Sequence, residues 1–259
     1  MDDTPPEPDD AAQLASASYQ LPALDQGFLL GDSMRGVRFL LEFAKADEAL
    51  RAWGVRSTIV VFGSARVREG AGRHGRWYDE ARRFGRIASE RGGAMLRAGG
   101  DRENVIATGG GPGIMEAANR GAFDVGAPSI GFNISLPHEQ QPNAYSTPEL
   151  TFRFHYFAMR KMHLAMRAKA LVIFPGGFGT LDEMFEIITL RQTDKAPSIP
   201  IVLFDERYWR SVINFDTLLQ EGMIGPADLG LFAFADSAEA VWDALLTGGL
   251  KRGDALSPA

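Results

Sequence analysis

The sequence predicts an α/β fold: a single doubly wound, Rossmann-like domain in which a parallel sheet has helices on both faces. Two observations carry this prediction. Short runs rich in β-branched residues alternate along the chain with segments of helical length, as in repeated strand–helix–strand units. The strand-length runs are apolar at nearly every position, which is typical of parallel strands that are covered on both sides.

The expected strands and helices alternate along the chain after residue 54. Six strands are expected, at residues 57–62, 105–108, 129–134, 170–174, 200–204 and 231–234. Six helices are expected between and after them, at residues 77–91, 114–125, 157–168, 181–192, 209–221 and 238–246. Residues 151–156 alternate polar and aromatic side chains, which suits either a further strand or an extended lead-in to the next helix.

The two ends of the chain differ from this pattern. Residues 1–25 mix Pro, Asp, Ala and Ser with little apolar periodicity, and we expect them to form an acidic, disordered tail. The domain is expected over residues 26–250, including an N-terminal helix that starts near Asp32 and Ser33 and ends at Gly54. Residues 251–259 are expected to be a flexible C-terminus.

Charge and cysteine content exclude several classes of protein. Twenty-seven basic and thirty-three acidic side chains give a net charge of −6, which argues against a protein that wraps duplex nucleic acid. The absence of cysteine removes disulfides, thiolate metal sites and a cysteine nucleophile. The acidic N-terminus is unlike a secretory leader, and the apolar runs are too short to span a membrane. We expect a cytoplasmic protein that binds neither nucleic acid nor membranes.

Three glycine-containing turns each follow an expected strand and open a helix-length segment. They lie at residues 62–66, 108–113 and 174–180. In an open parallel sheet such turns share the carboxyl edge, where glycine lets backbone amides approach an anion and the helix N-terminus adds positive potential. The alternative is that the glycines only serve tight turns and packing. None of the turns is a Walker loop or a good G-x-G-x-x-G match, so the three together favour a phosphate site over a dinucleotide site.

Two charged groups lie close to these turns in the expected topology. Thr180 and Glu183 have the spacing of a capping box, but the same position brings the Glu183 carboxylate near whatever the glycine loop holds. Arg160 lies in the first turn of the helix expected at residues 157–168, which leads into the fourth expected strand. The N-terminal end of such a helix lies near the carboxyl edge of the sheet, so Arg160 is expected close to the glycine turns, whereas Arg167 should be distant. The alternative for this helix is a solvated basic face. The four histidines show no ligand spacing, and no metal site is expected.

The glycine motifs at residues 109–117 and 175–183 resemble those of the LOG ("Lonely Guy") family, and the resemblance covers about residues 30–248. Residues 131–143 are similar to the longer bacterial branch. Members include cytokinin riboside 5′-monophosphate phosphoribohydrolases, and many were once labelled lysine decarboxylases. The resemblance implies hydrolysis of the N-glycosidic bond of a purine nucleoside 5′-monophosphate, AMP or N6-prenyl-AMP, to free base and ribose 5-phosphate. It also implies a homodimer or higher homo-oligomer and no cofactor.

The resemblance assigns roles to particular residues. Arg160 and Glu183 match the catalytic pair, and Met159 stands where the family has a polar residue, which leaves the preferred base open. Lys161, Glu139 and Thr189 are implied ligand contacts. The phosphate and substrate contacts expected from the glycine turns are Gly63, Ser64, Gly110, Gly111, Gly113, Gly176, Gly177, Phe178, Gly179 and Thr180. An ionised Glu183 would stabilise oxocarbenium character at the ribose, and Arg160 would hold the carboxylate or the substrate.

Two other functions remain open from the sequence. A non-catalytic carrier of a nucleotide or of a molybdenum cofactor is the main alternative, since related folds carry that cofactor or hold single-stranded DNA. A decarboxylase would need a Schiff-base lysine for pyridoxal phosphate, and among five lysines only Lys161 is expected near the site.

Overall fold

The computed structural model describes residues 9–70, 72–95, 100–136 and 141–253, with Arg73 described by its backbone alone. The chain divides into two units, Met1–Ala44 and Lys45–Ala259. The boundary falls inside a long helix, α3 (Arg35–Ala52).

The first unit is made of short helical segments. They are α1 (Ala11–Leu14), a 3-10 helix (Ala17–Tyr19), α2 (Gln26–Leu30) and a second 3-10 helix (Asp32–Met34), followed by the start of α3. The first two of these lie in the stretch expected to be disordered. The Arg38 guanidinium donates to the carbonyl oxygens of Leu29 and Gly31 at 2.8 and 2.6 Å, and these bonds join α3 to the end of α2.

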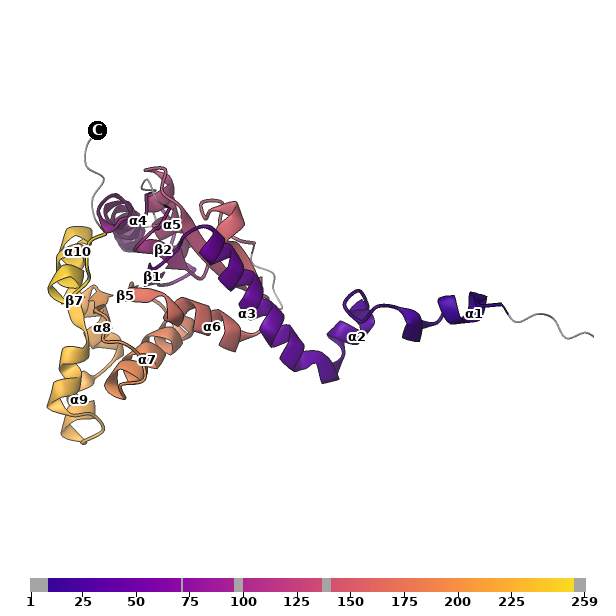
Figure 1. Cartoon of the computed structure of the whole chain (residues 1–259). Coiled ribbons are helices and arrows are strands. Elements are labelled where there is room, and N and C mark those ends of the chain that lie inside the picture. The colour runs from indigo at the N-terminus through magenta and orange to yellow at the C-terminus, as the bar shows by residue number, and fades with distance from the viewer. Residues whose placement is uncertain (1–8, 71, 96–99, 137–140, 254–259) are drawn as a thin grey trace, which may run out of the picture. The chain divides into compact units, whose positions relative to one another are not determined.

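The second unit contains a seven-stranded sheet in which every pair of neighbouring strands is parallel (Figure 1). The strands are β1 (Thr58–Phe62), β2 (Val105–Thr108), β3 (Ser129–Ile134), β4 (Thr151–Phe154), β5 (Ala168–Ile173), β6 (Ile201–Phe204) and β7 (Ala233–Ala235). Their order across the sheet is β4-β3-β2-β1-β5-β6-β7. The strands β1, β2 and β6 are buried throughout, which explains why their sequences are apolar at consecutive positions.

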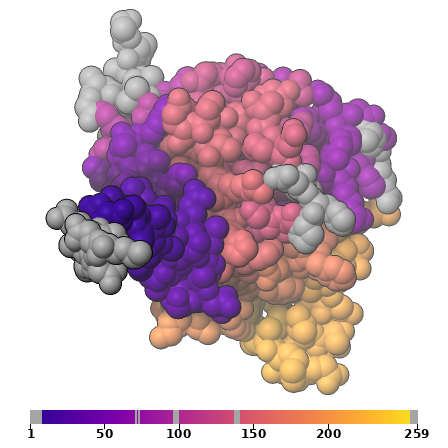
Figure 2. All heavy atoms as spheres, turned by 90° about the vertical axis from the view of Figure 1, so that its right-hand side faces the viewer, coloured from indigo at the N-terminus to yellow at the C-terminus, as the bar shows by residue number. Residues whose placement is uncertain are grey.

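Helices cover both faces of this sheet. They are α4 (Gly72–Gly92), α5 (Ile114–Phe123), α6 (Phe157–Met166), α7 (Phe178–Gln192), α8 (Glu206–Val212), α9 (Phe215–Gln220) and α10 (Ala238–Thr247), with 3-10 helices at Pro148–Leu150 and Pro226–Leu231. The helices α4, α5 and α10 pack together on one face, while α6 and α7 lie on the other (Figure 1). In the space-filling view the region around α9, coloured light orange to yellow, projects from the lower edge of this unit (Figure 2). These features confirm the predicted α/β fold.

Three expectations are refined. The alternating segment at residues 151–156 forms β4, which pairs with β3. The single helix expected over residues 209–221 is two helices, because the side chain of Asn214 accepts a hydrogen bond from the Thr217 amide and begins a new one. The last strand starts at Ala233 rather than at residue 231, since Pro226–Leu231 form a 3-10 helix.

The strand order places a crevice between β1 and β5. From β1 the chain proceeds through β2 and β3 to β4 in one direction, and from β5 through β6 to β7 in the other. The loops that follow β1 and β5 therefore diverge at the carboxyl edge, which is where open α/β sheets bind their ligands. Within the described parts of the chain, no helix is long and apolar enough to cross a membrane.

Candidate active site

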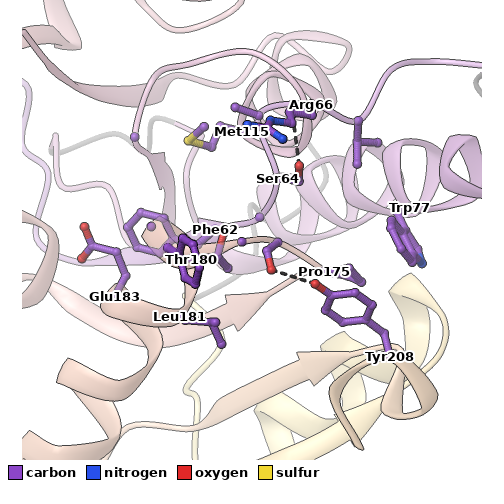
Figure 3. Close-up of a pocket in the computed structure, with 18 of the residues that line it drawn as sticks. Phe62, Ser64, Arg66, Trp77, Met115, Pro175, Thr180, Leu181, Glu183 and Tyr208 are labelled. Atoms are coloured by element: carbon purple, nitrogen blue, oxygen red, sulfur yellow. Dashed lines mark hydrogen bonds between the residues drawn. The ribbon is translucent and has the colours of Figure 1, made fainter. Parts of the chain in front are cut away.

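A large pocket opens at the switch in strand order. Its volume is about 1510 Å³, and it is lined by the loops after β1, β5 and β6, by the first turns of α4 and by residues of α6 and α7 (Figure 3). Nine of the residues expected at the site line it: Gly63, Ser64, Arg160, Gly176, Gly177, Phe178, Gly179, Thr180 and Glu183. Segments far apart in the sequence are thus brought together as the topology requires.

The loop after β5 has the backbone features expected of an anion site. The helix α7 begins at Phe178, so the amides of Phe178 and Gly179 have no intrahelical acceptor, whereas those of Thr180 and Leu181 donate to the Gly177 carbonyl oxygen. A side chain at Gly176 could not be accommodated, because its Cβ would lie 2.1 Å from the Thr180 hydroxyl oxygen and 3.0 Å from the Ser64 amide nitrogen. At Gly177 and Gly179 a Cβ would meet nothing within 4 Å. The loop therefore approaches its neighbours closely on one side and is open on the other.

The loop after β1 is locked against the loops beside it. The Ser64 amide donates to the Pro175 carbonyl oxygen at 3.0 Å, and the Ser64 carbonyl oxygen accepts from the Ile114 amide at 3.1 Å. Gly113 has a φ of +76°, and a Cβ there would lie 2.3 Å from the Ser64 carbonyl oxygen. Only glycine meets both conditions, so Gly113 has a packing role beneath the pocket.

The other two residues expected from the second glycine turn are also beneath the surface of the pocket. Gly110 accepts a hydrogen bond from the Asn143 amide at 2.8 Å, and Gly111 accepts one from the Asn143 side-chain amide at 3.2 Å. Neither lines the pocket, whereas the preceding Gly109 does. These contacts hold the turn to the segment that follows β3.

Arg160 and Glu183 form a buried ion pair in the wall of the pocket. Nη2 of Arg160 donates to Oε1 of Glu183 at 2.5 Å, and their side chains are 11% and 5% exposed. The capping-box hypothesis for Glu183 is wrong, because α7 starts two residues before Thr180 and its N-cap is Gly177. The Glu183 carboxylate is free of the helix terminus and faces the pocket instead (Figure 3).

The electrostatics of this pair are unusual for an ion pair. Burial raises the pKa of the Glu183 carboxyl above its ordinary value, and the charges of Arg160 and Lys161 lower it without cancelling that effect. A carboxyl whose pKa is perturbed by burial beside a specific charge, in a cleft, is characteristic of a functional site. The Arg160 guanidinium also lies 5.3 Å from the centre of the Phe157 ring, within cation–π range.

The α6 helix does not carry the solvated basic face that its sequence allowed. His163 is buried, and Arg167 forms an ion pair with Asp47 at 2.6 Å. The Arg167 carbonyl oxygen accepts from the Thr58 amide at the start of β1, which places it at the opposite edge of the sheet. The prediction that Arg160 lies near the glycine turns and Arg167 far from them is confirmed.

The apolar end of the pocket beside Arg160 was not predicted from the sequence. Met115, Ile134, Leu136 and Phe157 line it, together with Asn133 at the end of β3. Asn133 is 8% exposed, and its amide oxygen has no hydrogen-bond partner among the described residues. This oxygen is packed against Gly110, where an added Cβ would lie 2.0 Å from it, so the unpaired acceptor is buried behind the pocket wall and is not presented to a ligand. The only sign of this buried amide in the sequence is a polar residue near the end of a mostly apolar strand.

Besides Gly110, Gly111 and Gly113, three further expected residues lie outside this pocket or outside the described residues. Lys161 and Thr189 line a second hollow of about 570 Å³ on α6 and α7, and Glu139 falls outside the residues that the structure describes. The Lys161 ammonium is 2.7 Å from the carboxylates of both Asp182 and Glu186.

This position of Lys161 does not suit pyridoxal phosphate. Burial lowers the pKa of the Lys161 ammonium, but its hydrogen bonds to Asp182 and Glu186 outweigh burial and raise it. A Schiff-base lysine must lose its proton and reach the cofactor, and none of the lysines with described side chains lines the main pocket. Likewise, the described side chains include no cluster of three or more His, Cys, Asp or Glu placed to hold a metal ion.

Comparison with known proteins identifies relatives of this chain. Residues 115–245 match the family model described as "Possible lysine decarboxylase". The chain is 28% identical over 139 residues to cytokinin riboside 5′-monophosphate phosphoribohydrolase LOG1 of Arabidopsis thaliana, a match that covers 52% of this chain and 64% of that protein. It is 30% identical over 139 residues to the probable enzyme of that name, LOG4, of Oryza sativa subsp. japonica, covering 52% and 59%. The matches thus span less than two thirds of either relative.

One solved structure shares the fold at low sequence identity. The X-ray structure of TM1055 superposes with a TM-score of 0.52 and 18% identity, covering 74% of this chain and 99% of that one. The molybdenum cofactor binding protein of Rippkaea orientalis gives a TM-score of 0.48, also at 18% identity, covering 74% and 96%. The family match covers half of the chain and includes Glu183 and Arg160. The chain therefore belongs to the LOG family, the family described as possible lysine decarboxylases.

Proposed function

We propose that this protein hydrolyses the N-glycosidic bond of purine nucleoside 5′-monophosphates, AMP or an N6-modified AMP. The products are the free base and ribose 5-phosphate, with one water consumed. The observation that carries the proposal is the buried Arg160–Glu183 pair beside a glycine loop suited to a phosphate. The named activity of the curated relatives supports it.

The glycine loop would anchor the 5′-phosphate. The open amides at the start of α7 and the Thr180 hydroxyl offer hydrogen bonds, and the helix dipole adds positive potential. Because the phosphate takes no part in bond cleavage, its binding energy can serve to hold C1′ of the ribose in position.

Glu183 would act on the ribose. Cleavage of the C1′–N bond develops oxocarbenium character, which an ionised carboxylate stabilises while it orients the ribose hydroxyls or the attacking water. Arg160 would fix that carboxylate through its rigid guanidinium, which also keeps part of the Glu183 population ionised despite burial.

The apolar end of the pocket would receive the base. Phe157 and Met115 offer apolar surface to a purine, and Asn133 lines the same part of the pocket. An N6 substituent would extend toward Leu136.

A homodimer in the cytoplasm is part of the proposal. The outer faces of α6 and α7 expose large apolar side chains beside the site, among them Met162, Met166, Phe178 and Phe185. Sedimentation of the purified chain would report a dimer, and Phe185→Lys should shift it toward monomer. A monomer at all concentrations would contradict this part of the proposal.

The activity is tested by incubating the purified protein with AMP and with N6-isopentenyl-AMP and separating the products. Free base and ribose 5-phosphate should appear in equal amounts, and Glu183→Ala should abolish their release. Intact nucleotides after prolonged incubation would overturn the proposal. A pterin that co-purifies without nucleotide hydrolysis would favour a carrier instead.

A further inference from the structure

The pocket continues past the glycine loop, away from Glu183, into a second compartment. We call it the annex, and it is lined by His74, Trp77, Asp205, Arg207 and Tyr208. In Figure 3, Glu183 lies at one end of the drawn residues and Trp77 and Tyr208 at the other, with Thr180 and Pro175 between them. A phosphate on the glycine loop would therefore have the reacting centre on one side and the annex on the other.

The aromatic wall of the annex has a defined geometry. The rings of His74 and Trp77 are stacked, with centroids 4.7 Å apart and an angle of 15° between their planes. Tyr208 meets the Trp77 indole edge-on at 5.5 Å and 71°. Trp77 remains partly exposed to the pocket, so it offers indole surface to a ligand.

Hydrogen bonds hold this aromatic wall to the glycine loop after β5. The Tyr208 hydroxyl donates to the Gly176 carbonyl oxygen at 2.8 Å, and the Trp77 indole N–H donates to Oδ2 of Asp205 at 2.8 Å. Oδ1 of Asp205 accepts from the Tyr208 amide at 3.0 Å. Asp205 adopts a φ of +68°, a left-handed backbone that is uncommon outside glycine and that directs its carboxylate to both partners.

The charge around the annex is positive although the whole chain is acidic. Arg207 and Arg76, the neighbour of Trp77 in sequence, line the pocket here and are exposed, while Arg66 lines it nearer Ser64 (Figure 3). The carboxylate of Asp205 accepts the two hydrogen bonds from the wall. Guanidinium groups beside an aromatic platform are the combination that binds nucleotide bases and phosphates together.

The volume of the pocket also favours a ligand larger than one nucleotide. Sites for single small ligands occupy roughly 300–1,000 Å³, and this pocket measures about 1510 Å³. One nucleoside monophosphate would occupy the glycine loop and the apolar end and leave the annex open.

We propose that the annex binds a second nucleotide unit joined through the 5′-phosphate, so that the site recognises dinucleoside 5′,5′-diphosphates. The bridging diphosphate would lie along the glycine loop, the distal base would pack on the stacked His74–Trp77 pair, and Arg207 would contact the distal phosphate or ribose. This inference rests on the proposed placement of the first phosphate on the glycine loop, and it concerns binding, without requiring that such ligands be hydrolysed.

The test compares the Kd values of AMP, ADP and P1,P2-diadenosine 5′-diphosphate by calorimetry, in a Glu183→Gln chain that leaves the ligands intact. The dinucleotide should bind at least about 10-fold more tightly than AMP. Arg207→Ala and Trp77→Leu should each reduce that ratio toward one while the Kd of AMP stays within about twofold. Arg210→Ala removes the same charge from α8 outside the pocket and should leave the ratio unchanged.

Each outcome decides the proposal. Equal affinities for AMP and the dinucleotide, or a ratio that survives both Arg207→Ala and Trp77→Leu, would overturn it. ADP binding as tightly as the dinucleotide would overturn the stacking of a second base. Hydrolysis of AMP by the unsubstituted protein is measured separately: AMP left intact with the ratio preserved refutes the proposed activity alone, and AMP hydrolysed with a ratio of one refutes the annex alone.

Discussion

Two buried arginine–carboxylate pairs flank the sheet, and they differ in what their environment does to the acid. Arg160–Glu183 lies in the pocket at the carboxyl edge, with a contact of 2.5 Å, and Arg167–Asp47 lies near the start of β1, with a contact of 2.6 Å. The exposed fractions of the four side chains are all 12% or less. Distance and burial therefore do not distinguish the two pairs.

The pKa shifts of the two acids have opposite directions. A hydrogen bond from Arg167 lowers the pKa of Asp47 and outweighs burial, with further lowering by the charges of Arg167, Arg51 and His163. For Glu183 burial is the largest effect and raises the pKa. An acid with a lowered pKa stabilises the fold above its unfolded pKa and loses that contribution as the pH falls. An acid with a raised pKa contributes most below the unfolded pKa, and that contribution is lost as the pH rises through the folded value. At neutral pH the ionised Asp47 therefore stabilises the fold, whereas ionisation of Glu183 lowers the stability of the fold. We propose that the Glu183 carboxylate serves the reaction instead.

The largest expected effect is on activity at Glu183. Glu183→Gln should lower kcat/KM for AMP by about 10³-fold, because the substituted amide cannot stabilise positive charge at the ribose. The melting temperature at pH 7 should change little, because the glutamine carbonyl oxygen can still accept from Arg160, and relief of the buried carboxylate offsets the cost of leaving the guanidinium without its counter-ion. Glu186→Gln, one turn further along α7 and outside the main pocket, is the matched control and should stay active. A Glu183→Gln protein as active as this control would refute the catalytic role.

The next effect is on stability at Asp47. Asp47→Ala leaves the buried Arg167 without its carboxylate, and breaking such a pair should lower the free energy of unfolding by about 3 kcal/mol. Urea unfolding at pH 7 measures this loss. Below the melting temperature of the variant, kcat for AMP should match that of the unsubstituted protein. A large loss of kcat in the folded variant would mean that both pairs serve the reaction.

Arg160→Lys should lower kcat/KM by about 10²-fold, because an ammonium keeps the charge but not the planar set of donors that holds Glu183. Arg167→Lys is the same substitution just beyond the end of the same helix and supplies the control, with activity retained. Equal activity of the two lysine variants would show that charge alone is sufficient at residue 160.

The smallest effect concerns Lys161, whose charge lowers the pKa of Glu183 from outside the pocket. Lys161→Gln should move the acid limb of the kcat/KM profile to higher pH by a fraction of a unit, with little change in the plateau. A limb that stays in place, or moves to lower pH, would contradict the electrostatic account. A fall in the plateau would instead indicate that Lys161 contacts the substrate.

Much of the fold could be predicted, because apolar strands in a parallel sheet leave a clear pattern. The same topology placed Arg160 near the glycine turns and Arg167 at the other edge. The capping-box hypothesis failed because spacing alone does not fix where a helix begins, and the glycine loop lets α7 start at Phe178. The break between α8 and α9 at Asn214 was not predicted, because a single capping side chain produces it and no change in the apolar pattern marks it.

The annex could not be predicted for a different reason. Trp77 comes from α4, Asp205 and Tyr208 come from the loop and helix after β6, and no local motif connects them. Only the order of strands brings these segments to one edge of the sheet. Similarly, Asn133 is a single amide at the end of an apolar strand, and its lack of a partner is visible only once its neighbours are known.

The most direct test of the central claim is the carboxyl ¹³C titration of Glu183 and Asp47 by NMR, set beside the pH profile of AMP hydrolysis. Asp47 should titrate below the ordinary aspartate value and Glu183 above the ordinary glutamate value, and the acid limb of kcat/KM should coincide with the Glu183 titration. A Glu183 carboxyl that titrates below its ordinary value, as Asp47 is expected to do, or an acid limb unrelated to it, would contradict the assignment of Glu183 as the group that acts on the substrate.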